Sequence, residues 1–316
     1  MLFLTAMIWG AAFVAQRAGM EYIGPFTFNG LRSYLGFLVL IPVILALDAQ
    51  KKKSGVITGV ASQSVSEKRA DTLMLLKGGL ACGAVLFVAS TLQQIGMVYT
   101  TAGKGGFITA LYIILVPVIG ILLGRSVRPI LWLAVVLATA GLYLLCIREG
   151  FSIDRGDLFV MASALGFSGH ILVIDYFTRK TDGVKMSALQ FLVCGILSTP
   201  FMAAFESLDW ANIVQCWLPI AYAGVMSCGV AYTLQIVGQK HTEPTVASLI
   251  MSLESVFAVL AGILILQESL TMRETIGCAV MFVAVILAQL PAGKRIAHRD
   301  AGAEETGTSV REGQYE

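Results

Sequence analysis

Glu254 lies at the centre of an apolar stretch of the chain. Residues 248–266 read SLIMSLESVFAVLAGILIL, in which Glu254 is the one charged residue. A charged side chain at the centre of a bilayer costs about 2.5–3.5 kcal/mol on insertion scales, so such residues usually face a cavity or a partner. The sequence therefore predicts one of two roles. Either Glu254 binds a substrate ammonium or a proton in a polar cavity, or it packs helices as a neutral, hydrogen-bonded side chain.

Two further titratable residues lie inside apolar stretches. Arg32 either holds a substrate carboxylate through its forked guanidinium or extends toward the membrane surface. His170 is either a proton relay or substrate donor, or a neutral ring bonded to a neighbouring carbonyl. Glu254 and His170 are therefore the two candidates for proton coupling.

Five uncharged residues complete the candidate site. Each lies in an apolar stretch, where its side chain either lines a cavity or holds two helices together. These residues are Trp9, Gln93, Tyr112, Gln190 and Gln235.

The composition indicates an integral membrane protein. The chain is 57% hydrophobic and 13% charged, with a mean hydropathy of +0.79, whereas soluble domains are about a quarter charged. A net charge of +2 without a basic arm argues against a nucleic-acid partner. The six cysteines form no CxxC pair, so neither a disulfide framework nor a metal site is expected, and no cofactor is predicted.

Apolar runs near the bilayer length of about 20 residues recur along the chain. They predict an all-α protein with ten membrane spans, at residues 2–20, 25–47, 78–98, 104–124, 129–147, 157–178, 185–205, 211–238, 244–266 and 272–290. Residues 48–77 are expected to form a long polar loop. Residues 291–316 are expected to be a disordered tail.

Lys and Arg residues concentrate in the connections on one side of the predicted membrane. The positive-inside rule assigns that side to the cytoplasm. An even number of spans then places both termini and the tail in the cytoplasm. We therefore expect a multi-pass protein of the plasma or inner membrane, in contact with the lipid bilayer.

The two halves of the chain repeat one pattern. An offset of 142 residues pairs Gln93 with Gln235 and Tyr112 with Glu254. Such matches are weak singly, but they fall in one register. Each pair is therefore expected to approach across the interface between the halves.

This pattern predicts two five-helix repeats, at residues 1–147 and 156–290. Because five is odd, the second repeat must enter the membrane upside down relative to the first. Inverted repeats are a transporter architecture, in which the substrate lies near the midplane at the repeat interface. The expected fold is thus ten helices around a central cavity.

Two segments resemble a known family. They are IWGAAFVAQRAG at residues 8–19 and SLESVFAVLAGILILQESLT at residues 252–271. With the duplicated layout, they resemble the EamA-type branch of the drug/metabolite transporter superfamily over residues 5–290. The resemblance implies ten helices around a substrate cavity and export of amino acids, related metabolites or drugs. The chain departs from the family pattern at Ser255, where Pro is frequent, and at Gln267, where Gly is frequent.

Other function classes lack their characteristic residues. The chain has no HExxH motif, and TTAGKGG around Lys104 lacks the spacing of a phosphate-binding loop, so neither an enzyme nor an ATP-driven protein is expected. One Glu, one Arg and one His make a poor ring for an ion channel. A membrane scaffold is a third alternative, but the polar loop is too small to form a soluble domain.

The sequence therefore predicts a secondary transporter of a small organic molecule. Opposite charges on Glu254 and Arg32 suit a zwitterion such as an amino acid. Export follows from the family resemblance, and an uptake permease is the alternative. A homodimer is compatible with the sequence, which contains nothing that supports it.

Overall fold

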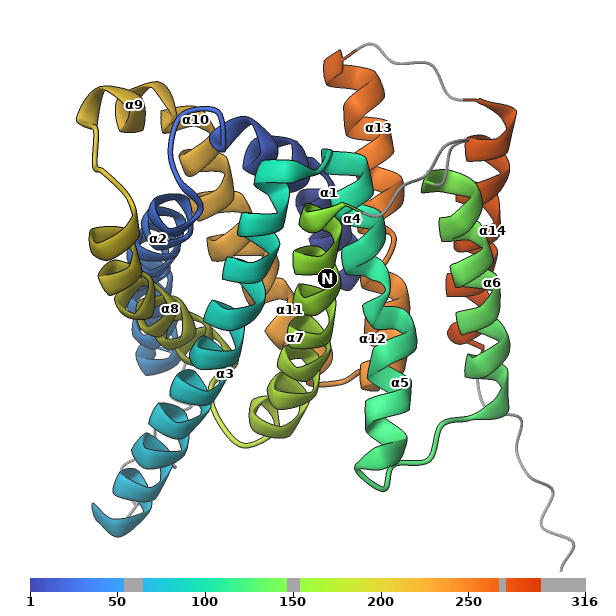
Figure 1. The fold of residues 1–316 in the computed structure, drawn as a ribbon. Helices are drawn as coiled ribbons and strands as arrows, with labels where there is room; N and C mark the ends of the chain where they lie inside the picture. The colour runs from blue at the N-terminus through green and yellow to red at the C-terminus, as the bar shows by residue number, and fades with distance from the viewer. Residues whose placement is uncertain (54–64, 147–153, 267–270, 291–316) are drawn as a thin grey trace, which may run out of the picture.

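The computed structural model describes residues 1–53, 65–146, 154–266 and 271–290 (Figure 1). These residues form helices joined by turns, with no strand among them. Over this part of the chain the protein is therefore all-α.

The helices follow one another with short connections. The first half contains α1 (Leu2–Gly19), α2 (Pro25–Lys53), α3 (Val65–Tyr99), α4 (Ala102–Ala110), α5 (Tyr112–Leu122) and α6 (Pro129–Cys146). The second half contains α7 (Arg155–Thr178), α8 (Gly183–Phe205), α9 (Trp210–Gln215), α10 (Trp217–Ala221), the π-helix η2 (Tyr222–Ala231), α11 (Tyr232–Gln239), α12 (Pro244–Met251), α13 (Glu254–Leu266) and α14 (Met272–Ala288).

Eight helical runs in the described residues are long and apolar enough to cross a membrane. They are Leu2–Gly19, Pro25–Gln50, Ser66–Tyr99, Ala102–Leu122, Arg155–Thr178, Gly183–Phe205, Trp217–Gln239 and Pro244–Ala261. A shorter apolar helix covers Pro129–Leu144, and α14 has 17 residues. The protein is thus a multi-pass membrane protein.

Local residue chemistry sets where several helices begin. Pro25, Pro129 and Pro244 are the first residues of α2, α6 and α12. Proline suits this position because its missing N–H would have no partner there. The Asp182 side chain accepts hydrogen bonds from the backbone N–H groups of Val184 and Lys185, at 3.0 and 3.1 Å, and so caps α8.

The expectation of a long polar loop at residues 48–77 is wrong for most of that range. Helix α2 continues to Lys53, and α3 already begins at Val65; residues 54–64 lie outside the described part. The charged residues here are mostly Lys, Arg and Glu, which favour helix, so both helices extend past their apolar segments. An ion pair of 2.9 Å between Asp48 and Lys185 links the extension of α2 to α8.

One predicted span is broken between α12 and α13. The hydroxyl groups of Ser248 and Ser252 donate to the carbonyl groups of Thr245 and Leu249, at 2.9 and 2.8 Å. Such bonds compete with the helical backbone pattern and bend helices. The Leu253 N–H bonds to a carbonyl three residues back rather than four. The helix therefore restarts at Glu254.

The span that contains η2 is also irregular. Pro219 has no N–H, and in an unbroken α-helix its ring would clash with the carbonyl four residues earlier, at Gln215, where α9 ends. The chain resumes as α10 and then forms the ten-residue π-helix η2 before α11. π-Helices are rare, and the short π-bulges in which they mostly occur are frequent at functional sites.

Helices from the two halves of the chain lie side by side (Figure 1). Helix α3 packs along α7, α2 along α8, α1 along α13, and α6 along α14. The α6–α14 pair forms one edge of the molecule, and the remaining helices surround its centre (Figure 1).

Candidate functional site

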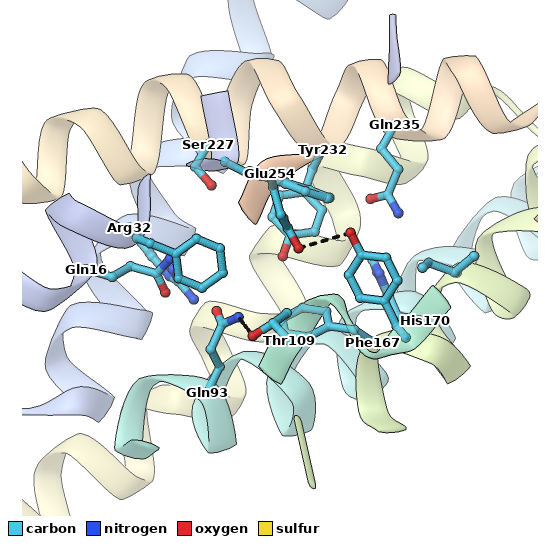
Figure 2. Close-up of a pocket in the computed structure, with 14 residues that line it drawn as sticks. Gln16, Arg32, Gln93, Thr109, Phe167, His170, Ser227, Tyr232, Gln235 and Glu254 are labelled. Atoms are coloured by element: carbon cyan, nitrogen blue, oxygen red, sulfur yellow. Dashed lines mark hydrogen bonds between the residues drawn. The ribbon is translucent and has the colours of Figure 1, made fainter. Parts of the chain in front are cut away.

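A cavity lies among α1, α2, α3, α4, α5, α7, η2, α11 and α13, with about 450 Å³ of empty space, open solvent included (Figure 2). Aromatic and polar side chains form most of its wall. The lining residues are Trp9, Phe13, Gln16, Arg32, Gln93, Thr109, Tyr112, Phe167, His170, Ile171, Ser227, Tyr232, Gln235 and Glu254. All the residues predicted for the site except Gln190 lie in this wall.

Glu254 is buried at the first position of α13. Its carboxylate accepts a hydrogen bond of 3.0 Å from the hydroxyl of Tyr112, which is the first residue of α5 (Figure 2). A helix N-terminus carries partial positive charge, which stabilises a carboxylate placed there. The restart of the helix at Glu254 thus helps to keep this carboxylate in the cavity wall.

A close approach of α1 to α13 places Trp9 near Glu254. A Cβ atom at Gly10 would lie 2.5 Å from the Cβ of Phe257 and 2.7 Å from the backbone oxygen of Glu254. Only glycine therefore fits at this position without movement of α13. The glycine of the Trp9–Gly10 pair sets the distance between the two helices.

Arg32 points into the bundle and does not extend to the surface. It is 5% exposed, and its Nε and Nη2 donate to Oδ1 of Asn29 at 3.1 and 2.9 Å. Asn29 is held in turn by bonds of 3.2 and 3.3 Å to the hydroxyl groups of Thr91 and Ser198. Within the described residues no carboxylate pairs with Arg32. Its charge is therefore available to an anionic group in the cavity.

His170 contacts Gln190 behind the cavity wall. Nε2 of His170 lies 3.0 Å from Oε1 of Gln190, and both side chains are buried. An amide oxygen only accepts, so with the Gln190 amide in this orientation Nε2 of His170 carries the hydrogen and donates it. Gln190 thus orients the ring without lining the cavity itself. The alternative prediction, a bond from His170 to a backbone carbonyl, is not what the structure has at Nε2.

Tyr232 stands at the centre of an aromatic cluster. Its ring centroid lies 4.6 Å from that of Trp9, 5.4 Å from Phe191 and 5.9 Å from His170. The contacts with Phe191 and His170 are edge-to-face, an arrangement that aromatic rings prefer. The cluster makes one wall of the cavity rigid.

Several polar atoms at the cavity have no partner in the described part of the chain. They are Nε1 of Trp9, Oε1 of Gln16 and Oε1 of Gln235. Leaving such a buried group unpaired costs about 1–3 kcal/mol, so these atoms are suited to bond to a bound molecule. Gln93 differs because its amide already donates to the Thr109 hydroxyl, at 3.0 Å.

Sequence reasoning did not assign Asn29 or Tyr232 to the site. Each lies three residues before a predicted site residue, Arg32 or Gln235, and so on the same helix face. Helical spacing from the charged residues was therefore the signal that could have found them. No cluster of metal-ligating side chains occurs among residues that the structure describes.

Ion pairs join both ends of α7 to the span formed by α4 and α5. Near the start of α7, Nζ of Lys104 lies 2.6 Å from Asp157. Near its end, Arg125 lies 2.6 Å from Asp175. The two aspartates are largely buried, so these pairs hold the cavity helices together on either side of the site.

Comparisons with known proteins agree with one another. The sequence profile described as the EamA-like transporter family matches residues 1–147 and 154–290. An uncharacterized transporter of Archaeoglobus fulgidus is 30% identical over 92% of this chain and 84% of its own length. The uncharacterized transporter YoaV of Bacillus subtilis is 23% identical over 89% of this chain and 92% of its own.

The fold also resembles a solved one. A crystal structure of a protein superposes with a TM-score of 0.68 at 18% identity, and covers 91% of this chain and 95% of that one. At this level of identity the likeness concerns the fold alone.

Proposed function

The chain belongs to the EamA-like transporter family and is a membrane transporter, and from that premise we propose that it is a secondary transporter of a small zwitterionic metabolite, such as an amino acid. The substrate occupies the central cavity. Two inverted repeats, residues 1–147 and 156–290, make ten spans that rock around it. Both termini lie in the cytoplasm, and the protein exports its substrate from the cell.

One observation carries the substrate class. A buried cation and a buried anion, Arg32 and Glu254, line one cavity, and each bonds to a neutral partner rather than to the other. A charge without a charged partner is costly in a low-dielectric site. A zwitterion would supply a carboxylate to Arg32 and an ammonium to Glu254, and would lower that cost at both ends.

Proton coupling is assigned to Glu254 and His170. Both line the cavity and both are able to gain and lose a proton. In the proposed cycle, protonation of Glu254 releases the substrate ammonium, and deprotonation restores the site. The hydroxyl of Tyr112, which donates to the ionised carboxylate, accepts from the protonated one.

The test is comparative profiling of the culture medium. Cells would overproduce the wild type, Glu254→Gln or Arg32→Gln at matched membrane levels. A small set of amino acids or related zwitterions enriched outside only with the wild type is the expected result. Equal enrichment with all three proteins would overturn the roles of the two charges. Depletion of those solutes from the medium would overturn export and favour uptake.

A further inference from the structure

Tyr232 lies in the cavity wall where η2 meets α11. It is the first residue of α11, directly after η2, and it is largely buried. Its ring is held by Trp9, Phe191 and His170, as described above. Packing on several sides fixes the orientation of the ring, and therefore also the position of its hydroxyl group.

The hydroxyl of Tyr232 has no hydrogen-bond partner within the described residues. Other tyrosines near the cavity differ. The Tyr112 hydroxyl donates to Glu254, and the Tyr222 hydroxyl donates to the carbonyl of Ile8 at 3.1 Å. A buried tyrosine usually finds a partner for its O–H group. An oriented but unpartnered hydroxyl in a cavity is therefore placed to bond to a ligand.

Tyr232 also lines the same cavity as the two charged residues. The Arg32 guanidinium, the Glu254 carboxyl group and the Tyr232 side chain all belong to one wall-lining set. A solute whose carboxylate and ammonium occupied those two groups would therefore pass close to the Tyr232 hydroxyl (Figure 2).

We propose that Tyr232 is a specificity-determining residue, whose hydroxyl hydrogen-bonds the zwitterionic substrate between its charged ends. The proposal rests on the proposed function of the cavity. Loss of one such hydrogen bond is expected to weaken binding about tenfold. The aromatic ring packs in the cavity wall, so Tyr232→Phe removes the hydrogen bond to the substrate and retains the packing of the ring.

The first measurement separates recognition from folding. Purified Tyr232→Phe is expected to unfold at the temperature of the wild type, because its hydroxyl bonds to no other part of the described protein. Tyr222→Phe is the matched control. Tyr222 lies in the same span as Tyr232, but its hydroxyl donates to the carbonyl of Ile8 in α1, so the unfolding temperature of this variant is expected to fall. A decrease for Tyr232→Phe as large as that for Tyr222→Phe would overturn the proposal.

The second measurement uses proteoliposomes loaded with an isotope-labelled mixture of the twenty protein amino acids. For each amino acid that the wild type releases, Tyr232→Phe is expected to raise the half-saturating concentration about tenfold, with the maximal rate within about twofold. An unchanged half-saturating concentration would overturn the role of Tyr232 alone. If the wild type released none of the twenty, the proposed substrate class would fall, and the inference that rests on it with it.

Discussion

The hydroxyl of Tyr112 donates a hydrogen bond of 3.0 Å to the carboxylate of Glu254, although the two residues are 142 positions apart. Each is the first residue of a helix that restarts after a break, α5 in one half of the chain and α13 in the other. The contact therefore joins the two broken spans at the cavity. It also gives Glu254 a neutral donor, and within the described residues no cationic side chain pairs with it.

Replacing Glu254 by Gln is expected to lower transport at least about tenfold and to leave the fold intact. The amide oxygen of Gln still accepts from Tyr112, whereas the charge is lost. A hydrogen bond to a charged group contributes about 1.5–3 kcal/mol, which corresponds to about tenfold or more in affinity. Amino-acid efflux from proteoliposomes measures the change, with the unfolding temperature as a check on the fold.

Tyr112→Phe is the matched variant for this prediction, because it removes the donor and keeps the charge. We expect it to transport better than Glu254→Gln. If Glu254→Gln moved solute as fast as the wild type, the carboxylate would have no part in binding.

Asn29→Asp is expected to pair Arg32 with a carboxylate of the protein itself and so to weaken its binding of a substrate carboxylate. Oδ1 of Asn29 already lies 2.9 Å from Nη2 of Arg32, so an aspartate there would form a buried ion pair. The half-saturating concentration for a carboxylate-bearing solute should rise about tenfold or more, since the loss again concerns a charged hydrogen bond. Efflux rates measured from proteoliposomes over a range of solute concentrations give this half-saturating concentration.

Asn29→Ala distinguishes the charge from the contact. This variant frees Arg32 from its neighbour without neutralising it, so its effect on affinity should be smaller than that of Asn29→Asp. A larger effect of the alanine would mean that Asn29 acts by holding Arg32 in position.

Gly10→Ala is expected to destabilise the protein. The new Cβ would lie 2.7 Å from backbone atoms of α13, at Glu254 and Ala258, which side-chain movement cannot relieve. Overpacking of this kind costs about 1–3 kcal/mol. Thermal unfolding in detergent measures it. Gly103→Ala is the control, since a Cβ there meets nothing within 4 Å; equal unfolding temperatures for the two variants would contradict the close approach of α1 to α13.

Glu206→Ala is expected to loosen the start of α2. The Glu206 carboxylate accepts from the backbone N–H groups of Phe26 and Thr27, at 2.8 and 2.7 Å, and from the Thr27 hydroxyl, at 2.6 Å. Loss of a helix cap costs about 0.5–2 kcal/mol. Hydrogen exchange at the N–H groups of Phe26 and Thr27 should become faster. Glu206→Gln, which retains an acceptor oxygen, should show a smaller increase.

Much of the helical layout was predictable because single residues determine it. Pro25 and Pro244 begin helices where the sequence expected spans to begin, and the span expected at 185–205 is the helix Gly183–Phe205. The breaks were not predictable from hydropathy. The break between α12 and α13, for example, depends on where the hydroxyl groups of Ser248 and Ser252 direct their hydrogen bonds, and an apolar scale does not register that choice.

The sequence predicted the charged members of the candidate site and also the cavity-lining Trp9, Gln93, Tyr112 and Gln235, but not Asn29 or Tyr232. Arg32 and Glu254 stand out because a bilayer makes any charge conspicuous. Asn29 and Tyr232 stand out less, since an uncharged polar side chain in an apolar stretch can either line a cavity or hold two helices together. Their roles follow from partners that lie far away in the chain, such as Ser198 for Asn29 and Trp9 for Tyr232.

The number of residues in the π-helix η2 determines which side chains of this span line the cavity. Two residues five positions apart lie about 140° apart around an α-helix and would face different directions. Here the N–H of Tyr232 bonds to the carbonyl of Ser227, five residues back, so the wider turn brings the two side chains nearer to one side of the helix, and both line the cavity. Deleting one residue of η2 would restore an α-helix and turn one of these side chains away. The register of the backbone, more than the choice of side chain, decides which face of this span the solute meets.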